Sequence, residues 1–241
     1  TYMVSDSYGA TESSSFTVSI HDEPASAAVT ALSTTHGLYY VEITFDEGSL
    51  EDYDSTPDGY YFGDDLNSVG YDIFRDGELL TTLNDNDVSS FYYLDNGIDP
   101  STTYSYDVQS FNSDDRRGEL VNISETTGDR PTVELLSPNG AEIWSVGDNY
   151  PVDVVTTDKQ YINDIEVFYS SDGGGTWTSS GSINSDSEST EISSDGSGIN
   201  YDAQVKVVVT DGGDFYGANS NSNEDGSDNS FTMAAHILSH S

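Results

Sequence analysis

Apolar and polar residues alternate along this chain in short stretches. The clearest stretches lie at residues 15–20, 39–45, 71–74, 104–111 and 205–209. Because successive side chains of a strand point to opposite faces, a period of two predicts half-buried β-strands. No stretch of ten or more residues carries the 3.6-residue period of an amphipathic helix. The pattern therefore predicts an all-β protein.

Turn-forming residues separate these stretches at regular intervals. They lie at Asp76-Gly77, Asn96-Gly97, Pro138-Asn139-Gly140, Asp172-Gly173 and Asp211-Gly212. Short strands at this spacing are typical of β-sandwiches. A length of 241 residues leaves room for about two domains of this kind. We therefore expect tandem β-sandwiches.

The first segment, residues 1–23, contains a turn with Gly9 and then an alternating stretch from Phe16 to Ile20. It resembles the last hairpin of polycystic-kidney-disease-like or cadherin-like surface repeats. The resemblance implies the terminal hairpin of a preceding sandwich, and with it a chain that is a piece of a larger or processed protein.

Residues 24–129 resemble a fibronectin type III domain. Residues 71–80 form two alternating stretches around Asp76-Gly77, like the central hairpin of that family, and residues 94–108 resemble the approach to its penultimate strand. Tyr104 would then be the tyrosine corner, whose hydroxyl ties that strand to the preceding loop. An acidic insertion at residues 46–65 departs from the family pattern.

Residues 130–233 resemble an immunoglobulin-like module of secreted prokaryotic proteins, through residues 137–147, 165–177, 201–210 and 231–233. Arg130-Pro131 would be a short, stiff linker before it, and Trp144 and Trp177 are expected in its core. Residues 234–241 carry no acid and would form a connector or the start of a next element.

One short motif, Ser170-x-Asp172-x-Gly174-x-Thr176-Trp177, is similar to the Asp-box of sialidases. Sialidases repeat this box, whereas it occurs once here. In that family the box is a structural hairpin remote from catalysis, so we expect a structural role.

Charge narrows the choice of function. Acids outnumber bases 44 to 6, which gives a formal net charge of -38. Such a surface repels nucleic acid and anionic lipid, and no apolar run is long enough for membrane insertion. Abundant Asp beside only two lysines, Lys159 and Lys206, resembles proteins of halophilic or marine prokaryotes. Because the charge repels itself, we expect the fold to need salt or bound cations.

Calcium is the cation that the acidic loops would suit, since it takes six to eight oxygen ligands. No organic cofactor is expected. The candidate ligands fall into two groups, one around the insertion and one in the second module. They are Asp46, Asp52, Asp54, Asp58, Asp64 and Asp65, and Asp211, Asp214, Asp225 and Asp228. The alternative is that these loops are solvated acidic surface without ordered ions.

Other chemistry has little support in the sequence. Acids are so abundant that no carboxylate pair points to glycoside hydrolysis, and none of the four histidines stands beside a G-x-S-x-G nucleophile motif. Asn122-Ile123-Ser124 is a glycosylation acceptor sequence. Adjacent aromatic residues could pack between modules or, alternatively, stack on sugars; they are Tyr39, Tyr40, Tyr53, Tyr60, Tyr61, Phe62, Tyr92 and Tyr93.

These features together favour a non-enzymatic extracellular structural protein. We expect a segment of a cell-surface layer, surface filament or adhesin from a halophilic or marine prokaryote. The most specific version of this hypothesis is an archaeal source. Its partners would be copies of itself or adjacent modules, with glycans as a further candidate and no nucleic acid. Two alternatives stay open: accessory carbohydrate- or partner-binding modules of a secreted hydrolase, and a viral tail or capsid decoration protein.

Overall fold

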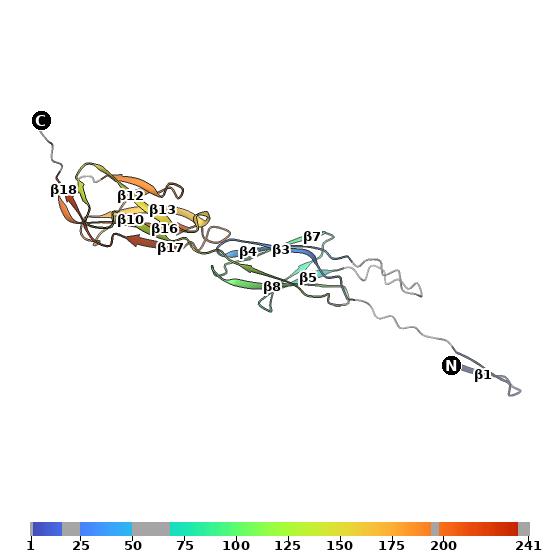
Figure 1. Ribbon diagram of the computed structural model, residues 1–241. Helices are drawn as coiled ribbons and strands as arrows, with labels where there is room; N and C mark the ends of the chain where they lie inside the picture. The colour runs from blue at the N-terminus through green and yellow to red at the C-terminus, as the bar shows by residue number, and fades with distance from the viewer. Residues whose placement is uncertain (1, 16–24, 50–67, 194–197, 236–241) are drawn as a thin grey trace.

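The computed structural model describes residues 2–15, 25–49, 68–193 and 198–235. Strands β1 (Tyr2–Ser5) and β2 (Thr11–Ser14) pair as an antiparallel hairpin at the N-terminal end of the chain (Figure 1). Asp6 closes its turn, since its carboxylate accepts the backbone N–H groups of Tyr8 and Ala10. Of the strand expected at residues 15–20, only Ser15 lies within the described residues.

The next seven strands form a sandwich of two antiparallel sheets, seen as two layers in Figure 1. One sheet has the order β3-β4-β7 and the other β6-β5-β8-β9. The strands are β3 (Thr30–His36), β4 (Tyr40–Asp46), β5 (Gly70–Arg75), β6 (Glu78–Asn84), β7 (Ser90–Asn96), β8 (Thr103–Phe111) and β9 (Val121–Thr126).

Alternation builds the core of this first sandwich. Val41, Ile43 and Phe45 of β4 are at most 1% exposed, and the residues between them are not buried. From the other sheet, Tyr106 and Val108 of β8 meet them in the same cluster. The period-two pattern therefore correctly predicted which faces are buried.

Tyr104 is the predicted tyrosine corner, and its hydroxyl accepts a 3.0 Å hydrogen bond from the backbone N–H of Asp99. The guanidinium of Arg75 lies over the Tyr104 ring, 5.3 Å from its centre. Arg75 also donates two hydrogen bonds, of 2.8 and 3.0 Å, to the buried carboxylate of Asp95. Tyr106 donates to the same carboxylate at 2.8 Å, so the buried charge accepts three hydrogen bonds from two side chains.

The remaining strands form a second sandwich, which carries the short 3-10 helix η3 (Lys159–Tyr161). One sheet has the order β10-β12-β15, and the other β11-β18-β16-β13-β14, with β17 also paired to β16. The strands are β10 (Val133–Ser137), β11 (Ile143–Ser145), β12 (Asn149–Thr156), β13 (Ile162–Ser170), β14 (Thr178–Ser182), β15 (Ser189–Ser193), β16 (Asn200–Asp211), β17 (Ser222–Gly226) and β18 (Phe231–Ala234).

Strand β16 runs through the centre of this second core. Its inward residues Ala203, Val205, Val207 and Val209 are at most 1% exposed. Trp144 lies in the same cluster, as predicted. Trp177 does not, because it lies at the edge of the sheet and is half-buried, with the Lys206 ammonium 5.1 Å from its ring centre.

The Asp-box motif forms the hairpin between β13 and β14. The carboxylate of Asp172 accepts hydrogen bonds from the Thr176 backbone N–H, the Thr176 hydroxyl and the Ser170 hydroxyl. The Ser170 oxygen in turn accepts the backbone N–H of Gly174 at 2.9 Å. These side chains therefore stabilise the turn itself, which is the structural role that we expected of this motif.

Candidate functional site

The joint between the two sandwiches holds the most developed cluster of polar contacts between distant parts of the chain. Tyr39 lies just before β4, and Asp211 is the last residue of β16. The Tyr39 hydroxyl donates to Oδ2 of Asp211 at 2.6 Å and accepts from Nδ2 of Asn221 at 2.9 Å. The first sandwich is thereby tied to both ends of the loop that connects β16 to β17 in the second.

Both central side chains of the joint are shielded from water. Tyr39 is 6% exposed and Asp211 is 2% exposed. The other carboxylate oxygen of Asp211 accepts the backbone N–H groups of Gly213 and Asn221. A buried carboxylate is costly unless donors surround it, and these donors come from both modules. The bond is therefore part of what makes burial of Asp211 tolerable.

Backbone contacts fix Tyr39 in position. Its carbonyl accepts the N–H groups of Gly97 and Ile98, which follow β7. The Arg130 guanidinium lies 5.5 Å from the centre of the Tyr39 ring. Burial, followed by the hydrogen bond to Asp211, raises the pKa of Tyr39 above its ordinary value of 10.0. The hydroxyl therefore keeps its proton, and the hydrogen bond its donor, at neutral pH.

Aromatic packing extends the joint on one side. The Tyr40 and Phe215 rings meet edge to face with centres 5.0 Å apart, and the Phe215 N–H donates to Oδ1 of Asn96 at 3.1 Å. Phe215 also contacts Tyr216, whose ring is largely exposed. The first sandwich thus contacts the 211–221 loop through both rings and backbone.

Tyr161 packs closely against the end of the first sandwich. A Cβ on Gly128 would lie only 2.4 Å from Cε2 of the Tyr161 ring. Glycine is therefore the residue that lets this ring approach the backbone. The cavities left at the joint are small, about 190 Å³ beside Tyr161 and about 120 Å³ beside Arg130. The joint is packed rather than open.

Sequence analysis identified both Tyr39 and Asp211 but did not connect them. It placed Tyr39 among residues that pack between modules or bind sugars, and the first of these alternatives is the one observed for Tyr39 and Tyr40. Asp211 was a candidate calcium ligand. Alternation could have revealed its burial, because Asp211 is the next inward position of β16 after Val209.

The other described carboxylates predicted to bind calcium each have hydrogen bonds within the protein. Asp46 accepts from the Ser90 hydroxyl, and Asp225 from the Leu135 backbone N–H. Asp214 accepts the backbone N–H groups of Tyr216 and Ala218. Asp228 accepts from the Asn139 amide at 3.3 Å. These carboxylates stabilise loops and strand ends.

The calcium prediction itself stays untested. Asp52, Asp54, Asp58, Asp64 and Asp65 lie outside the described residues. Within the described ranges, no group of three or more His, Cys, Asp and Glu side chains is placed to hold a metal ion. The segment that spaces Asn219, Asn221, Asn223 and Asp225 two apart runs into strand β17, so it forms no continuous ion-binding loop.

Asn122 is exposed on β9, and its amide donates to the Ser105 hydroxyl, the Tyr106 carbonyl and the Asp107 carboxylate. Glycosylation there stays a prediction.

Over the described part of the chain, no helix has the length and apolar character needed to cross a bilayer.

The few basic residues occupy structural positions. Besides Arg75 and Arg130, Arg117 pairs with Asp72 and Asp115. Lys159 pairs with Glu188 at 2.9 Å, and Lys206 with Glu224 at 3.1 Å. These contacts leave the acidic surface largely without cations from the protein itself.

Comparison with known proteins gives structural similarity only. No protein-family model matches the sequence, and no curated protein matches it. The solved structures that are similar include the fibronectin(III)-like modules of Clostridium thermocellum CbhA, at 13% identity over 91% of this chain and 98% of that one, with a TM-score of 0.32. The FN1–FN3 domains of chicken CNTN1 are 14% identical over 87% and 70%, with a TM-score of 0.33.

A two-domain fibronectin type III segment of chicken tenascin is also similar, at 11% identity over 82% of this chain and 98% of that one, with a TM-score of 0.31. The strands and sheets define the class of this protein: all-β, with tandem sandwiches of the fibronectin type III-like and immunoglobulin-like kind.

Proposed function

We propose that this chain is a stiff, non-enzymatic segment of an extracellular cell-surface structure, such as a surface layer, filament or adhesin of a halophilic or marine prokaryote. The observation that carries the proposal is the joint. Tyr39, Asp211 and Asn221 connect the two sandwiches through one buried and one partly buried hydrogen bond. A short linker with such an interface transmits force and direction from one module to the next, whereas a loose linker would not.

Charge supports the same proposal. A net charge of -38 destabilises the compact state through self-repulsion unless salt or bound cations screen it. Cations would then serve both the fold and the contacts with neighbouring copies of the chain, whose equally acidic surfaces would otherwise repel. If the cations are ordered rather than diffuse, we propose that the acidic insertion binds them as calcium ions.

Residual dipolar couplings test the stiffness of the joint. The two sandwiches of the whole chain should share one alignment tensor, and a Tyr39→Phe variant should show different tensors for the two. Independent tensors in the unaltered chain would contradict a rigid segment.

The extracellular location is tested separately. Antibodies against the chain should label intact source cells; labelling only after permeabilisation would contradict the extracellular location.

A second candidate, an accessory carbohydrate- or partner-binding unit, is supported by the aromatic surface beside the joint. Tyr92 is 51% exposed, Phe215 43% and Tyr216 76%. Exposed aromatic rings can stack on sugar rings. Binding to a glycan array that Tyr92→Ala and Tyr216→Ala abolish would favour this function over the scaffold.

A further inference from the structure

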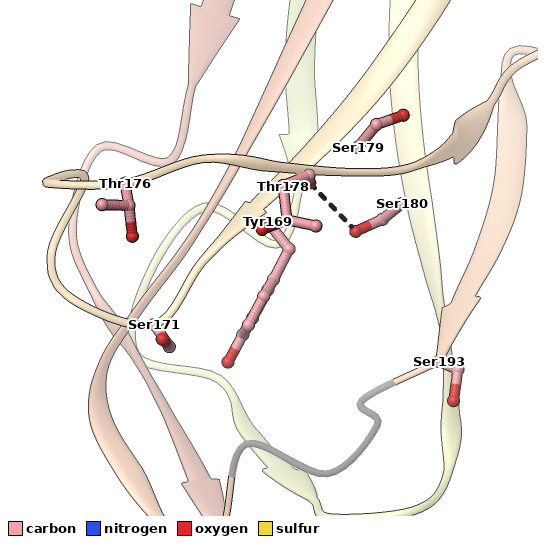
Figure 2. Close-up of a pocket in the computed structure, with 7 residues that line it drawn as sticks. All are labelled: Tyr169, Ser171, Thr176, Thr178, Ser179, Ser180 and Ser193. Carbon is pink, nitrogen blue, oxygen red and sulfur yellow. Dashed lines mark hydrogen bonds between the residues drawn. The ribbon is translucent and has the colours of Figure 1, made fainter.

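A buried hydroxyl without a partner lies at the end of the first sandwich away from the joint, where β4 ends and β5 begins. Tyr71 of β5 is 0% exposed, and its ring contacts those of Phe45 and Phe91. Its hydroxyl forms no hydrogen bond with the described residues. By contrast, the hydroxyls of Thr176 and Ser179 beside the cavity of about 430 Å³ in Figure 2 already donate to carboxylates. Tyr71 therefore has bonding capacity that the described protein does not use.

Alternation along two strands brings carboxylates to the same end of the sandwich. The inward position of β4 that follows Phe45 is Glu47. On β6, Leu83 packs against the core, and the next position on that face is Asp85. The backbone N–H groups of both acids continue the strand pairing, with 3.0 Å bonds to the residues that precede β7 and β5. Each sheet thus contributes one half-buried carboxylate at the end of the core.

The effects of these groups on one another's pKa values place them close together. Burial is the largest of the causes that raise the pKa of Tyr71 to about 12, and the carboxylates of Glu47 and Asp85 contribute to the same rise. Ser68 opposes it, but neither Ser68 nor Asp85 forms a hydrogen bond of normal geometry with the hydroxyl. Burial, followed by the carboxylates of Asp85 and Asp87, raises the pKa of Glu47 above its ordinary value of 4.5. Negative charges are therefore crowded beside the Tyr71 hydroxyl.

The described part of the protein supplies no cation to this cluster. None of its ion pairs includes Glu47 or Asp85. Asp85 accepts one hydrogen bond, from the backbone N–H of Asp87 at 2.9 Å, and the Glu47 carboxylate accepts none from the described residues. Like charges beside a buried polar group are costly unless a positive charge lies between them. A hard cation would supply that charge and would also use the lone pairs of the hydroxyl.

We propose that Glu47, Asp85 and the Tyr71 hydroxyl bind one calcium ion at this end of the first sandwich. Carboxylates that bind through one or both oxygens, together with hydroxyls and waters, make up the six to eight oxygen ligands of calcium. Such a set contains two acids, so it does not require the group of three that the described residues lack. Its role rests on the proposed stabilisation by cations, but it uses none of the aspartates assigned to calcium from the sequence.

Calcium titration of the whole chain, followed by amide chemical shifts at fixed high ionic strength, tests the proposal. The amides of Glu47, Tyr71 and Asp85 should shift saturably, and excess chelator should reverse the shifts. The absence of saturable shifts at these amides, or shifts confined to residues 50–65, would overturn the proposal.

Substitution of the two acids tests them as ligands. Glu47→Gln and Asp85→Asn should each weaken calcium binding by about tenfold or more, because each removes a charged ligand. Glu119→Gln is the matched control, since it removes the same charge from an exposed position just before β9, at the same end of the sandwich. It should leave the affinity unchanged. Equal losses in all three variants would indicate diffuse attraction and would overturn the site.

Tyr71→Phe tests the hydroxyl, because it keeps the ring that packs in the core. With chelator present, its melting temperature should equal that of the unaltered chain, since the hydroxyl lost has no partner among the described residues. Its calcium affinity should fall, though by less than that of Glu47→Gln, because water can replace a neutral ligand. A lower melting temperature with chelator and an unchanged calcium affinity would overturn the role of the hydroxyl.

A variant that neutralises Asp52, Asp54, Asp64 and Asp65 distinguishes this site from the proposed calcium binding by the acidic insertion. The calcium-dependent shifts of Glu47 and Asp85 should persist in that variant. Their loss would overturn a separate site at the end of the sandwich. Failure of the site leaves the stiffness of the joint, measured by dipolar couplings, as a separate question.

Discussion

The hydroxyl of Tyr39 donates a 2.6 Å hydrogen bond to Asp211, a residue 172 positions further along the chain. Few single contacts in this protein join residues so far apart in sequence while both are shielded from water. Each partner is anchored in its own sandwich, Tyr39 through backbone bonds to Gly97 and Ile98 and Asp211 as the end of β16. The geometry of the joint therefore depends on this pair.

Removing the hydroxyl tests that dependence. Tyr39→Phe leaves Oδ2 of the buried Asp211 without its donor, which should destabilise the joint by about 1–3 kcal/mol. Denaturant unfolding followed separately in each sandwich should show the two transitions moving apart. Tyr92→Phe is the matched control, since its hydroxyl bonds to Glu42 at an exposed site and its loss should cost less than about 0.5 kcal/mol. Equal effects of the two variants would contradict the role of the pair.

A substitution at Gly128 tests how closely the Tyr161 ring packs against the backbone there. Gly128→Ala puts a methyl group against the Tyr161 ring, and displacement of that ring should cost about 1–3 kcal/mol. Gly212→Ala is the control, because its added Cβ meets nothing within 4 Å although the residue also belongs to the joint. If thermal unfolding shows Gly128→Ala to be as stable as Gly212→Ala, the ring does not pack as described.

Arg75 tests the buried charge inside the first sandwich. Arg75→Met leaves Asp95 with the Tyr106 hydroxyl but without a cation, and we expect a loss of about 3 kcal/mol in denaturant unfolding. This is the lower end for breaking a buried pair, because the Arg75 side chain keeps 30% exposure. The free energy of unfolding of Arg75→Lys should lie between those of the unaltered protein and Arg75→Met. Lysine keeps the positive charge but loses the paired hydrogen-bond geometry of the guanidinium. A neutral effect of Arg75→Met would show that Asp95 is solvated.

Acid should weaken the contact between Glu188 and Lys159. The Lys159 hydrogen bond, with those from Thr156, lowers the pKa of Glu188 from 4.5 to about 2. A lowered folded-state pKa adds stability that is complete above pH 4.5 and disappears as the pH falls toward 2. Because protonation of other acids relieves repulsion at the same time, the comparison is with Glu188→Gln. The difference in melting temperature between the two proteins should shrink from pH 5 to pH 2; a constant difference would contradict the assignment.

Calcium should raise the melting temperature at fixed high ionic strength if the acidic loops bind it. At about 100 times its dissociation constant, one bound ion adds roughly 2.7 kcal/mol, a shift of several degrees. Mg²⁺ and a chelator are the controls. The Asp52→Asn, Asp54→Asn, Asp64→Asn and Asp65→Asn variant should lose the part of the rise that the insertion contributes. A response to total salt alone would mean diffuse screening.

Local patterns predicted most of the sandwich strands. The alternation at residues 39–45 and 205–209 corresponds to β4 and β16, and Asp76-Gly77 connects β5 to β6 as expected. Tyr104 takes the corner position that the resemblance implied. The strand and turn predictions succeeded because the alternation of a strand and the residues of a turn are determined by residues that are close in sequence.

The calcium predictions stay untested. Asp211 and Asp214 were chosen for calcium because of their acidic loops, and in the structure each carboxylate accepts hydrogen bonds from its own loop or from the joint.

By itself, the sequence determined the all-β class, the buried faces and the acidic surface, because period, turn chemistry and charge are local or additive properties. Only the tertiary structure decided that Tyr39 and Asp211 meet and that Tyr161 lies against Gly128. These depend on how two sandwiches and two sheets pack against each other. The free energy of such packing is distributed over residues far apart in the chain, so no short segment encodes it.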